Sequence, residues 1–553
     1  MRLAPTIMAG LFKTWIFMER TNKNASDQGW LGFFIEALLA PLLLSLQPIL
    51  KLYSINVAEL GLGDVLRPLL ASLLFAVLVV SLARLFFTSW RRANLFASLF
   101  LIIFFLFGDL SDWLQASIGW GPVRTDFIFL AIVAAVLTGW RWWVRRGLKN
   151  ERLVQTYFNL LSVLFFLNSS IGLFVKLSQE GAFTSSSQEP VIVNRTTGDQ
   201  ERPDIYYIIL DAYGREDILQ ELYQFDNSPL VKGLQSRGFY VAGQSSSNYI
   251  QTMLSLTSSL NMDYLQTLID QGKVTENRYE LIDVLQHSEV RRILSGHGYE
   301  MVSFHNEYKA TVPDAEVYYD DAGSGFLSPV SAFEGIVLDH TLARVVLVWR
   351  PINDVLIGMP YRMHSQNILS TFQHLREIPG LDGNYFVYAH VIAPHPPFVF
   401  DAEGNFLEHF EPFTLNDANY YIKDHSRKGY IAGYRKQIQY INTLLLQTVD
   451  EILANSKTPP IIIIQGDHGP GAYLHWGSLD STIPAERLGI LNAYYFPARD
   501  YEMLYSAISP VNSFRVVMNQ YFDGDYRLLP DQYYYSAWSF PFEFTEVTDL
   551  SLP

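Results

Sequence analysis

The sequence contains no cysteine among its 553 residues. A disulfide bond, a thiolate metal site and a cysteine nucleophile are therefore excluded. The absence carries no information about the cellular compartment, because chains without cysteine are found in all of them.

The second half of the chain also lacks basic residues relative to acidic ones. Residues 1–180 hold 16 Lys and Arg against 10 Asp and Glu, a net charge of +6, whereas residues 181–553 hold 24 against 45, a net charge of −21. Binding to nucleic acid needs a basic surface. We therefore expect no nucleic acid among the partners of this protein.

The first half carries five apolar stretches, each close to the roughly 20 residues that cross a bilayer. They lack the amphipathic rhythm of helices in soluble domains, so transmembrane helices are favoured over five buried helices of a soluble fold. The first stretch contains Glu36, which is either a functional acid within the membrane or a residue near its surface. The stretches are 31–50, 66–87, 95–114, 127–144 and 153–175.

Basic residues beside these stretches predict their orientation. They cluster before the first stretch, between the second and third, and between the fourth and fifth. The pattern predicts a cytoplasmic amino terminus and places everything after the fifth stretch on the outer, periplasmic or extracellular, face of the cell membrane. Charged residues interrupt the early apolar ones, so no cleavable signal peptide is expected. The clusters are Arg2, Lys13, Arg20 and Lys23; Arg84, Arg91 and Arg92; and Arg141, Arg145, Arg146, Lys149 and Arg152.

The composition then divides the chain into a transmembrane domain (1–176), a linker (177–202) and an outer domain (203–553). In the outer domain, short apolar strands alternate with amphipathic helices, which is typical of α/β layering. Residues 300–384 are expected to form an irregular, polar insertion over the sheet edge. The expected core strands are 204–210, 385–389, 461–464 and 488–495, and a helix with one apolar stripe is expected over 431–452.

Three of these strands end in side chains suited to catalysis. In α/β sheets such residues meet at the carboxyl edge, where active sites lie. A single polar residue at a strand end is as well explained by hydrogen bonding alone, but three at one edge argue against coincidence. The residues are Asp211; His390 and His395; and Asp467 and His468, with His475 seven residues later.

A candidate nucleophile lies in the Ser- and Thr-rich segment 245–260. One of residues 246–248 is expected to cap a helix whose first turns contain Thr252. Free N–H groups at such a helix start favour a phosphate oxyanion, and a divalent cation would lower the pKa of the hydroxyl. Taken alone, the segment is more often just a helix cap, and Ser255 and Thr257 are equal candidates.

These residues resemble the alkaline phosphatase superfamily, and within it the membrane-anchored, sulfatase-like phosphoethanolamine transferases and lipoteichoic acid synthases. The resemblance covers the architecture and the motifs over about 204–496. Asp211 matches an acid after the first strand, which is commonly Glu in these branches, and Thr252 with Ser255 three residues later matches the nucleophile motif. Asp467 and His468 match the Asp-His pair, and the matching histidines are His390, His395 and His475.

The resemblance implies an alkaline phosphatase-like α/β/α sandwich preceded by a five-helix transmembrane bundle. It also implies a bound metal, for which Mn²⁺, Mg²⁺ and Zn²⁺ are all suitable. The implied metal ligands are Asp211, Thr252, Asp467 and His468.

The implied reaction moves a phospho-headgroup from a membrane lipid donor to a surface glycan or lipid through a threonine-linked intermediate. Thr252 is then the nucleophile, His395 and His475 have catalytic and substrate-binding roles, and His390 binds substrate. Thr252 lacks the Cys/Ser-x-Pro-x-Arg context required for formylglycine, so sulfate ester hydrolysis is disfavoured. The alternatives are a metal-dependent phosphodiesterase or phosphatase with the same site, and a non-catalytic membrane scaffold.

Overall fold

The fold was analysed in a computed structural model, which describes residues 30–57, 62–179, 202–321, 330–347, 354, 356–409 and 411–548. The chain forms two compact units. Unit 1 comprises Met1–Ile55, Leu62–Phe174 and Val337–Val345, and unit 2 comprises Asn56–Gly61, Val175–Ile336 and Val346–Pro553. The predicted linker lies largely outside the described residues, and the predicted domain limits stay predictions.

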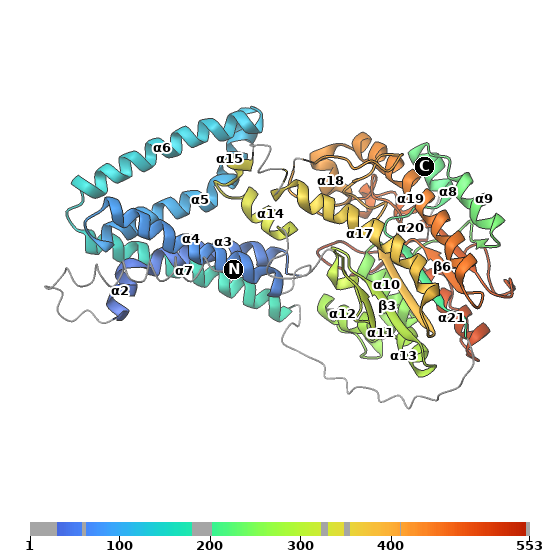
Figure 1. Cartoon of the computed structure of the whole chain (residues 1–553). Coiled ribbons are helices and arrows are strands. Elements are labelled where there is room, and N and C mark those ends of the chain that lie inside the picture. The colour runs from blue at the N-terminus through green and yellow to red at the C-terminus, as the bar shows by residue number, and fades with distance from the viewer. Residues whose placement is uncertain are drawn as a thin grey trace. The chain divides into compact units, whose positions relative to one another are not determined.

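Unit 1 is built from apolar helices (Figure 1). In the described part of the chain, four helices are long and apolar enough to cross a membrane, and they coincide with the second to fifth predicted stretches. The outer surface of these helices is apolar, since the side chains of Leu74, Leu85 and Phe174 are more than 60% exposed. The helices are α2 (Trp30–Ala37), α3 (Leu39–Ile55), α4 (Leu62–Phe86), α5 (Trp90–Ile118), α6 (Pro122–Arg146) and α7 (Glu151–Gln179).

The first predicted stretch is not one helix, which corrects the expected count of five. It is divided at Leu38 into α2 and α3. Pro41 has no N–H to donate to the carbonyl of Ala37, and its ring crowds that carbonyl, so the helix breaks one turn earlier. Two amides on α7 bind carbonyls next to the break: Gln155 donates to Glu36 and Asn159 to Ile35. Such compensation is what allows a broken helix in an apolar environment.

The segment Val337–Val345 packs against α5 and α6 within unit 1, although it lies far along the chain. Gly108 N donates to His340 O, and Leu342 N donates to Phe104 O. A Cβ at Gly108 would lie 2.5 Å from the carbonyl oxygen of Asp339, so only glycine allows this approach. Arg344 Nη1 adds a 2.9 Å ion pair with Asp112 Oδ1.

Unit 2 contains a mixed seven-stranded sheet in the order β2-β7-β6-β1-β5-β3-β4. The central strands β6, β1, β5 and β3 are parallel, and β7 is antiparallel to both of its neighbours. The strands are β1 (Ile205–Leu210), β2 (Tyr240–Val241), β3 (Glu300–Phe304), β4 (Val317–Tyr319), β5 (Tyr385–Val391), β6 (Ile461–Gln465) and β7 (Asn492–Tyr495); β8 (Tyr534–Tyr535) and β9 (Thr545–Glu546) form a separate hairpin.

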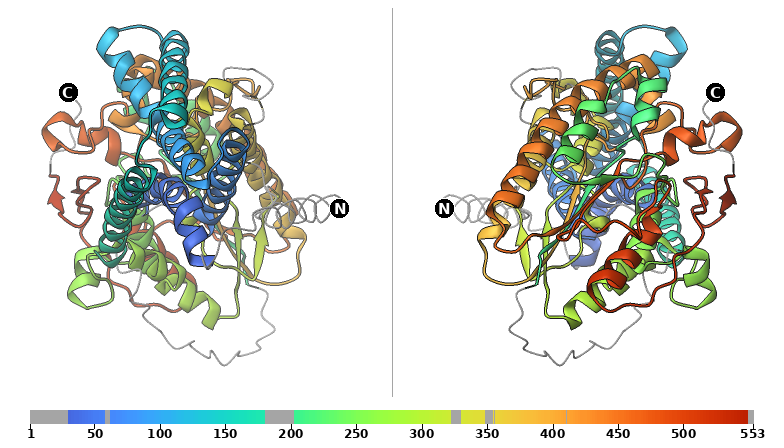
Figure 2. Two further views of the ribbon diagram at one scale, coloured as in Figure 1. Left: turned by 90° about the vertical axis from the view of Figure 1, so that its left-hand side faces the viewer. Right: turned by 90° about the vertical axis from the view of Figure 1, so that its right-hand side faces the viewer.

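Helices cover both faces of this sheet, which makes the α/β/α sandwich that was predicted (Figure 2). On one face, alternate strand residues such as Tyr207 and Ile463 join a core cluster with α10, α12, α13 and α21. Tyr206 and Ile462 are equally buried on the other face, where α17 and α19 lie (Figure 2). The helices described after β1 are α8 (Glu216–Tyr223), α9 (Ser228–Ser236), α10 (Thr252–Asn261), α11 (Leu265–Asp270), α12 (Arg278–Gln286), α13 (Glu289–Gly296), α14 (Ala332–Asp339), α15 (Arg344–Leu347), α17 (Gly358–Glu377), α18 (Ala418–His425), α19 (Arg427–Asn455), α20 (Pro484–Leu488) and α21 (Pro510–Tyr521). Of these, α14 and α15 overlap the segment Val337–Val345 of unit 1 and are not part of the sandwich.

Two sequence predictions for unit 2 need correction. The expected insertion over 300–384 is not an irregular cover, because it supplies β3, β4 and the 20-residue helix α17. The strand expected over 488–495 is only Asn492–Tyr495, because residues 484–488 form α20.

Candidate metal centre and nucleophile

The three strands that end in candidate residues are neighbours in the sheet. β1 lies between β5 and β6 and is parallel to both, and Ile209 is in register with His390 on one side and Gln465 on the other. Asp211 follows β1 directly, and Asp467 lies just beyond β6. The strand order therefore brings Asp211, His390 and Asp467 to one carboxyl edge, as the sequence predicted.

The turn after β6 depends on close backbone approaches. A Cβ at Gly466 would lie 2.6 Å from Tyr213 O, and one at Gly469 would lie 2.1 Å from Glu486 O. These glycines let the chain fold tightly enough to point Asp467 and His468 back across the sheet edge.

Asp211, His390 and Asp467 form a buried cluster suited to a cation. Each offers one ligand atom within 4.8 Å of the others. Asp211 Oδ1, Asp467 Oδ2 and His390 Nε2 are buried and have no hydrogen-bond partner. Buried polar atoms without partners are costly, and a bound cation would satisfy all three. Burial alone would raise the pKa of Asp211, but nearby His395 holds that pKa below its ordinary value.

Hydrogen bonds define the tautomer of His390. The Thr311 hydroxyl donates to Tyr308 O, so its oxygen accepts from His390 Nδ1 at 2.8 Å. His390 Nε2 is then left with a free lone pair that faces Asp211 Oδ2 at 3.3 Å. Two acceptors at this distance repel one another unless a cation or a proton lies between them. His390 therefore belongs with the candidate metal ligands as well as with the substrate-binding role predicted for it.

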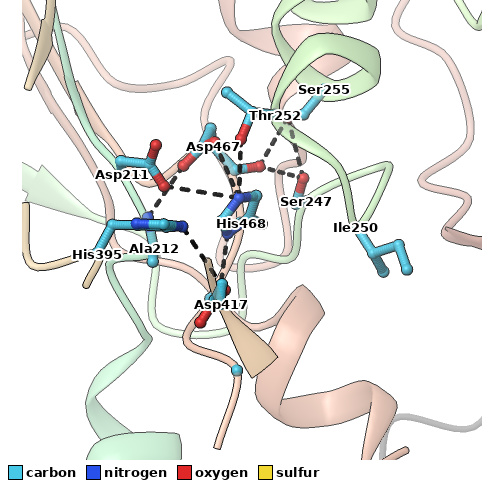
Figure 3. Close-up of polar contacts among 12 residues, drawn as sticks. Asp211, Ala212, Ser247, Ile250, Thr252, Ser255, His395, Asp417, Asp467 and His468 are labelled. Carbon is cyan, nitrogen blue, oxygen red and sulfur yellow. Dashed lines mark hydrogen bonds and ion pairs between the residues drawn. The ribbon is translucent and has the colours of Figure 1, made fainter. Parts of the chain in front are cut away.

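His468 lies beside the same two carboxylates (Figure 3). Its Nε2 lies 3.2 Å from Asp467 Oδ2 and 3.6 Å from Asp211 Oδ1. Its Nδ1 lies 3.0 Å from Gly469 O, which accepts the ring proton and leaves Nε2 with the lone pair. Burial lowers the pKa of His468, and the charge of Arg487 lowers it further, which favours the neutral ring.

The hydroxyl of Thr252 lies within hydrogen-bond distance of His468 Nε2. Thr252 is the first residue of α10, and its Oγ1 lies 3.0 Å from His468 Nε2 (Figure 3). The alternatives that the sequence left open are placed differently: Ser255 donates its hydroxyl proton to Asp467 O, and Thr257 Oγ1 is buried without a partner. The predicted cap is wrong, because the residue before the helix is Gln251 and it makes no side-chain cap.

The two remaining histidines differ. His395 lies close to the centre: its N donates to Asp211 O, and its Nε2 is 3.8 Å from Asp417 Oδ2. The His475 side chain is exposed, and its Nδ1 accepts from Gly477 N. Within the described residues, the structure gathers Asp211, Thr252, His390, His395, Asp467 and His468, whereas no hydrogen bond or ion pair joins the His475 ring to them.

Sequence reasoning missed a buried ion pair at the same site. Arg487 Nη1 donates to Asp417 Oδ2 at 2.6 Å, and Arg487 Nη2 lies 3.0 Å from His468 Nε2. Burial would raise the pKa of Asp417, but Arg487 and then His395 hold it below its ordinary value. Asp417 precedes a helix and lacks a strand-end signal. The only clue to Arg487 was a charged pair, Glu486-Arg487, directly before a core strand.

The fold and the site together define a class: an α/β/α domain whose sheet edge gathers acids and histidines around a hydroxyl, preceded by apolar helices. The model of the sulfatase family matches residues 203–506, which is more than half of the chain, so this protein belongs to the sulfatase family. The sequence resemblance to sulfatase-like enzymes is thereby confirmed. No curated protein matches the chain.

Solved structures similar to this chain include membrane enzymes. The integral membrane lipooligosaccharide phosphoethanolamine transferase A of Neisseria meningitidis is 13% identical, with 88% of this chain and 95% of that chain covered and a TM-score of 0.38. The C-terminal periplasmic domain of EptC from Escherichia coli, in complex with Zn, is 10% identical over 58% and 83%, with a TM-score of 0.37. The corresponding domain of phosphoethanolamine transferase EptC from Campylobacter jejuni is 13% identical over 60% and 92%, with a TM-score of 0.36.

Proposed function

We propose that this protein is a metal-dependent membrane phosphotransferase that moves a phospho-headgroup from a lipid donor to a surface glycan or lipid. The observation that carries this proposal is the direct contact between Thr252 Oγ1 and His468 Nε2, beside two carboxylates with unpartnered oxygens. A scaffold without activity would have no reason to keep such costly buried atoms together. Thr252 also cannot become formylglycine, which favours phosphoryl over sulfuryl chemistry.

The donor set fits a divalent cation. Asp211, Asp467 and His468, together with the Thr252 hydroxyl, would hold it, and His390 Nε2, 3.3 Å from Asp211 Oδ2, is a further candidate ligand. When bound, a Mn²⁺, Mg²⁺ or Zn²⁺ ion would lower the pKa of the Thr252 hydroxyl and offset charge on the phosphoryl oxygens. The His468 ring is held for this role, because Gly469 O keeps the proton on Nδ1.

The residues of the chain account for the remaining steps of the proposal. Thr252 Oγ1 loses its proton to solvent and forms a bond to phosphorus, while the bond between phosphorus and the lipid alcohol breaks. His395 lies within the site and can donate a proton to the leaving oxygen. The acceptor hydroxyl then attacks phosphorus and transfers its own proton to His395, while the bond between phosphorus and Thr252 Oγ1 breaks. The released Thr252 oxygen takes up a proton from solvent, which restores the hydroxyl.

The same proposal locates the reaction in the cell. Among the described residues, four helices are long and apolar enough to cross a membrane. The basic clusters between them would keep the amino terminus in the cytoplasm and unit 2 on the outer face. There the site would meet a membrane lipid as donor and a glycan or lipid of the cell surface as acceptor.

Mass spectrometry of the purified full-length chain tests the proposal. We expect a phospho-headgroup on the peptide that contains Thr252 after incubation with extracted membrane lipids. It should be lost in Thr252→Ala and retained in Ser258→Ala, a matched hydroxyl deletion on the same helix. An adduct on Ser255, or none with any divalent metal, would contradict the proposal. Release of free phospho-alcohol without an acceptor would instead identify a hydrolase with the same site.

A further inference from the structure

We infer that Arg487 and the divalent cation compete for one lone pair, that of His468 Nε2, and that metal binding releases Arg487 to bind the phosphoryl group. This inference rests on the metal-dependent function proposed above. A neutral imidazole has one lone pair available for bonding in the ring plane, and here it is on Nε2 of His468. In this structure Arg487 Nη2 lies 3.0 Å from His468 Nε2. A guanidinium only donates, so His468 is the acceptor in this contact.

Arg487 is anchored without the help of His468. Its Nε donates to Ile250 O at 2.9 Å, and its Nη1 donates to Asp417 Oδ2 and Gly469 O at 2.6 and 3.1 Å. Its guanidinium also lies 5.1 Å from the centre of the Trp476 ring. These contacts come from other atoms of the guanidinium, so losing the bond to His468 would leave the group in place.

The released donor then needs a new acceptor. Arg487 is only 1% exposed, and a buried N–H without a partner is costly. Its Nη2 shares the neighbourhood of Thr252 Oγ1, since both lie 3.0 Å from His468 Nε2. The group that would lie beside Thr252 during transfer is a phosphoryl group, and guanidinium donors match its oxygens well. Arg487 is therefore a positioning residue for His468 in the metal-free chain and a substrate-binding residue in the loaded one.

The first test measures Zn²⁺ affinity of the full-length chain by competition with a chelator, at pH 8. Arg487→Gln combined with Asp417→Asn removes both buried charges and keeps the net charge constant. Loss of a competing charged hydrogen bond should tighten Zn²⁺ binding by about tenfold or more. The matched control is Arg237→Gln with Asp450→Asn, which removes an exposed Arg–Asp ion pair with a 2.6 Å contact. This control should leave the Zn²⁺ affinity unchanged. An affinity within about twofold of the unmodified chain, or a weaker one, overturns the inference.

The second test uses inorganic phosphate as the probe with the zinc-saturated chain. We expect phosphate to bind about tenfold or more weakly to the Arg487 and Asp417 double variant than to the unmodified chain. Equal phosphate affinity would overturn the substrate-binding part of the inference.

The third test needs no substitution, so it stands even if the double variant does not fold. Cryo-electron microscopy of the full chain with and without Zn²⁺ should show Arg487 Nη2 beyond hydrogen-bond distance of His468 Nε2 only when zinc is bound, with Nη1 still on Asp417. Arg487 remaining on His468 Nε2 in the zinc-loaded chain overturns the inference. None of these readouts requires turnover, so failure to form the Thr252 adduct would refute the proposed transfer reaction separately.

Discussion

Thr311 determines which nitrogen of His390 faces the two carboxylates, because its oxygen accepts the Nδ1 proton at 2.8 Å. Thr311→Val keeps the shape of the side chain and removes that acceptor. Loss of such an orienting partner typically weakens metal binding by about 10- to 100-fold, and we expect this decrease in divalent metal affinity. Thr371→Val, which removes a buried hydroxyl bonded to Asn367 O on α17, is the control and should keep full affinity. Unchanged affinity in Thr311→Val would show that His390 does not face the ion.

The buried carboxyl of Glu486 should make the free energy of unfolding depend on pH. Burial raises its pKa from 4.5 to about 8. Between these values the folded chain binds the proton and the unfolded chain does not, so stability falls as pH rises across this window. Glu486→Gln mimics the protonated side chain and removes this term. From about pH 5 to about pH 8, the thermal unfolding midpoint should therefore fall more in the unmodified chain than in the variant. Parallel pH profiles would contradict this account.

Site residues that directly follow a core strand were predictable from the sequence. Site residues that lie on other segments were not. Asp211 and Asp467 follow apolar strands, and parallel strands bring their ends together. Asp417 and Arg487 come from segments whose only signal is a charge, and their contact with the site depends on packing between distant parts of the chain. His475 illustrates the converse, because a motif match does not show whether a side chain points toward the site.

At the scale of elements, close backbone approaches constrain the turn after β6. Gly469→Ala would place a Cβ 2.1 Å from Glu486 O and 2.8 Å from Gly489 O, both backbone atoms. We expect a loss of roughly 1–3 kcal/mol or more in the free energy of unfolding, and weaker metal binding as His468 shifts. Gly477→Ala is the control, because its nearest neighbour would be 3.8 Å away. Equal thermal midpoints for the two variants would contradict the argument.

Elements with strong periodicity were also predictable. Four apolar spans, three core strands and the helix α19 lie where apolar patterns placed them. The break between α2 and α3 was missed because it depends on the position of Pro41 within a run that is apolar throughout. The strands β3 and β4 were missed because they are short and flanked by polar residues.

At the scale of the whole molecule, the absence of cysteine allows a direct test of the proposed topology. Single cysteines at two exposed positions, Glu403→Cys in unit 2 and Lys149→Cys between α6 and α7, can be labelled with a membrane-impermeant maleimide. In intact cells we expect labelling at position 403, and at position 149 only after permeabilisation, because basic loops stay in the cytoplasm. The reverse pattern would place the site on the inner face.

In the proposed mechanism, residues far apart in the sequence hold one divalent cation beside Thr252. Equilibrium dialysis of the full-length chain against Mn²⁺, Mg²⁺ or Zn²⁺, followed by measurement of bound metal, tests this claim most directly. The double variant Asp211→Asn with Asp467→Asn replaces one oxygen of each carboxylate by an NH2 group, which removes the negative charge. The control is Asp382→Asn, which removes the acid of an exposed ion pair with Lys457. We predict at least one ion per chain in the unmodified protein and in Asp382→Asn, and none at this site in the double variant. Equal metal content in all three proteins, or no bound metal in the unmodified chain, would contradict the claim.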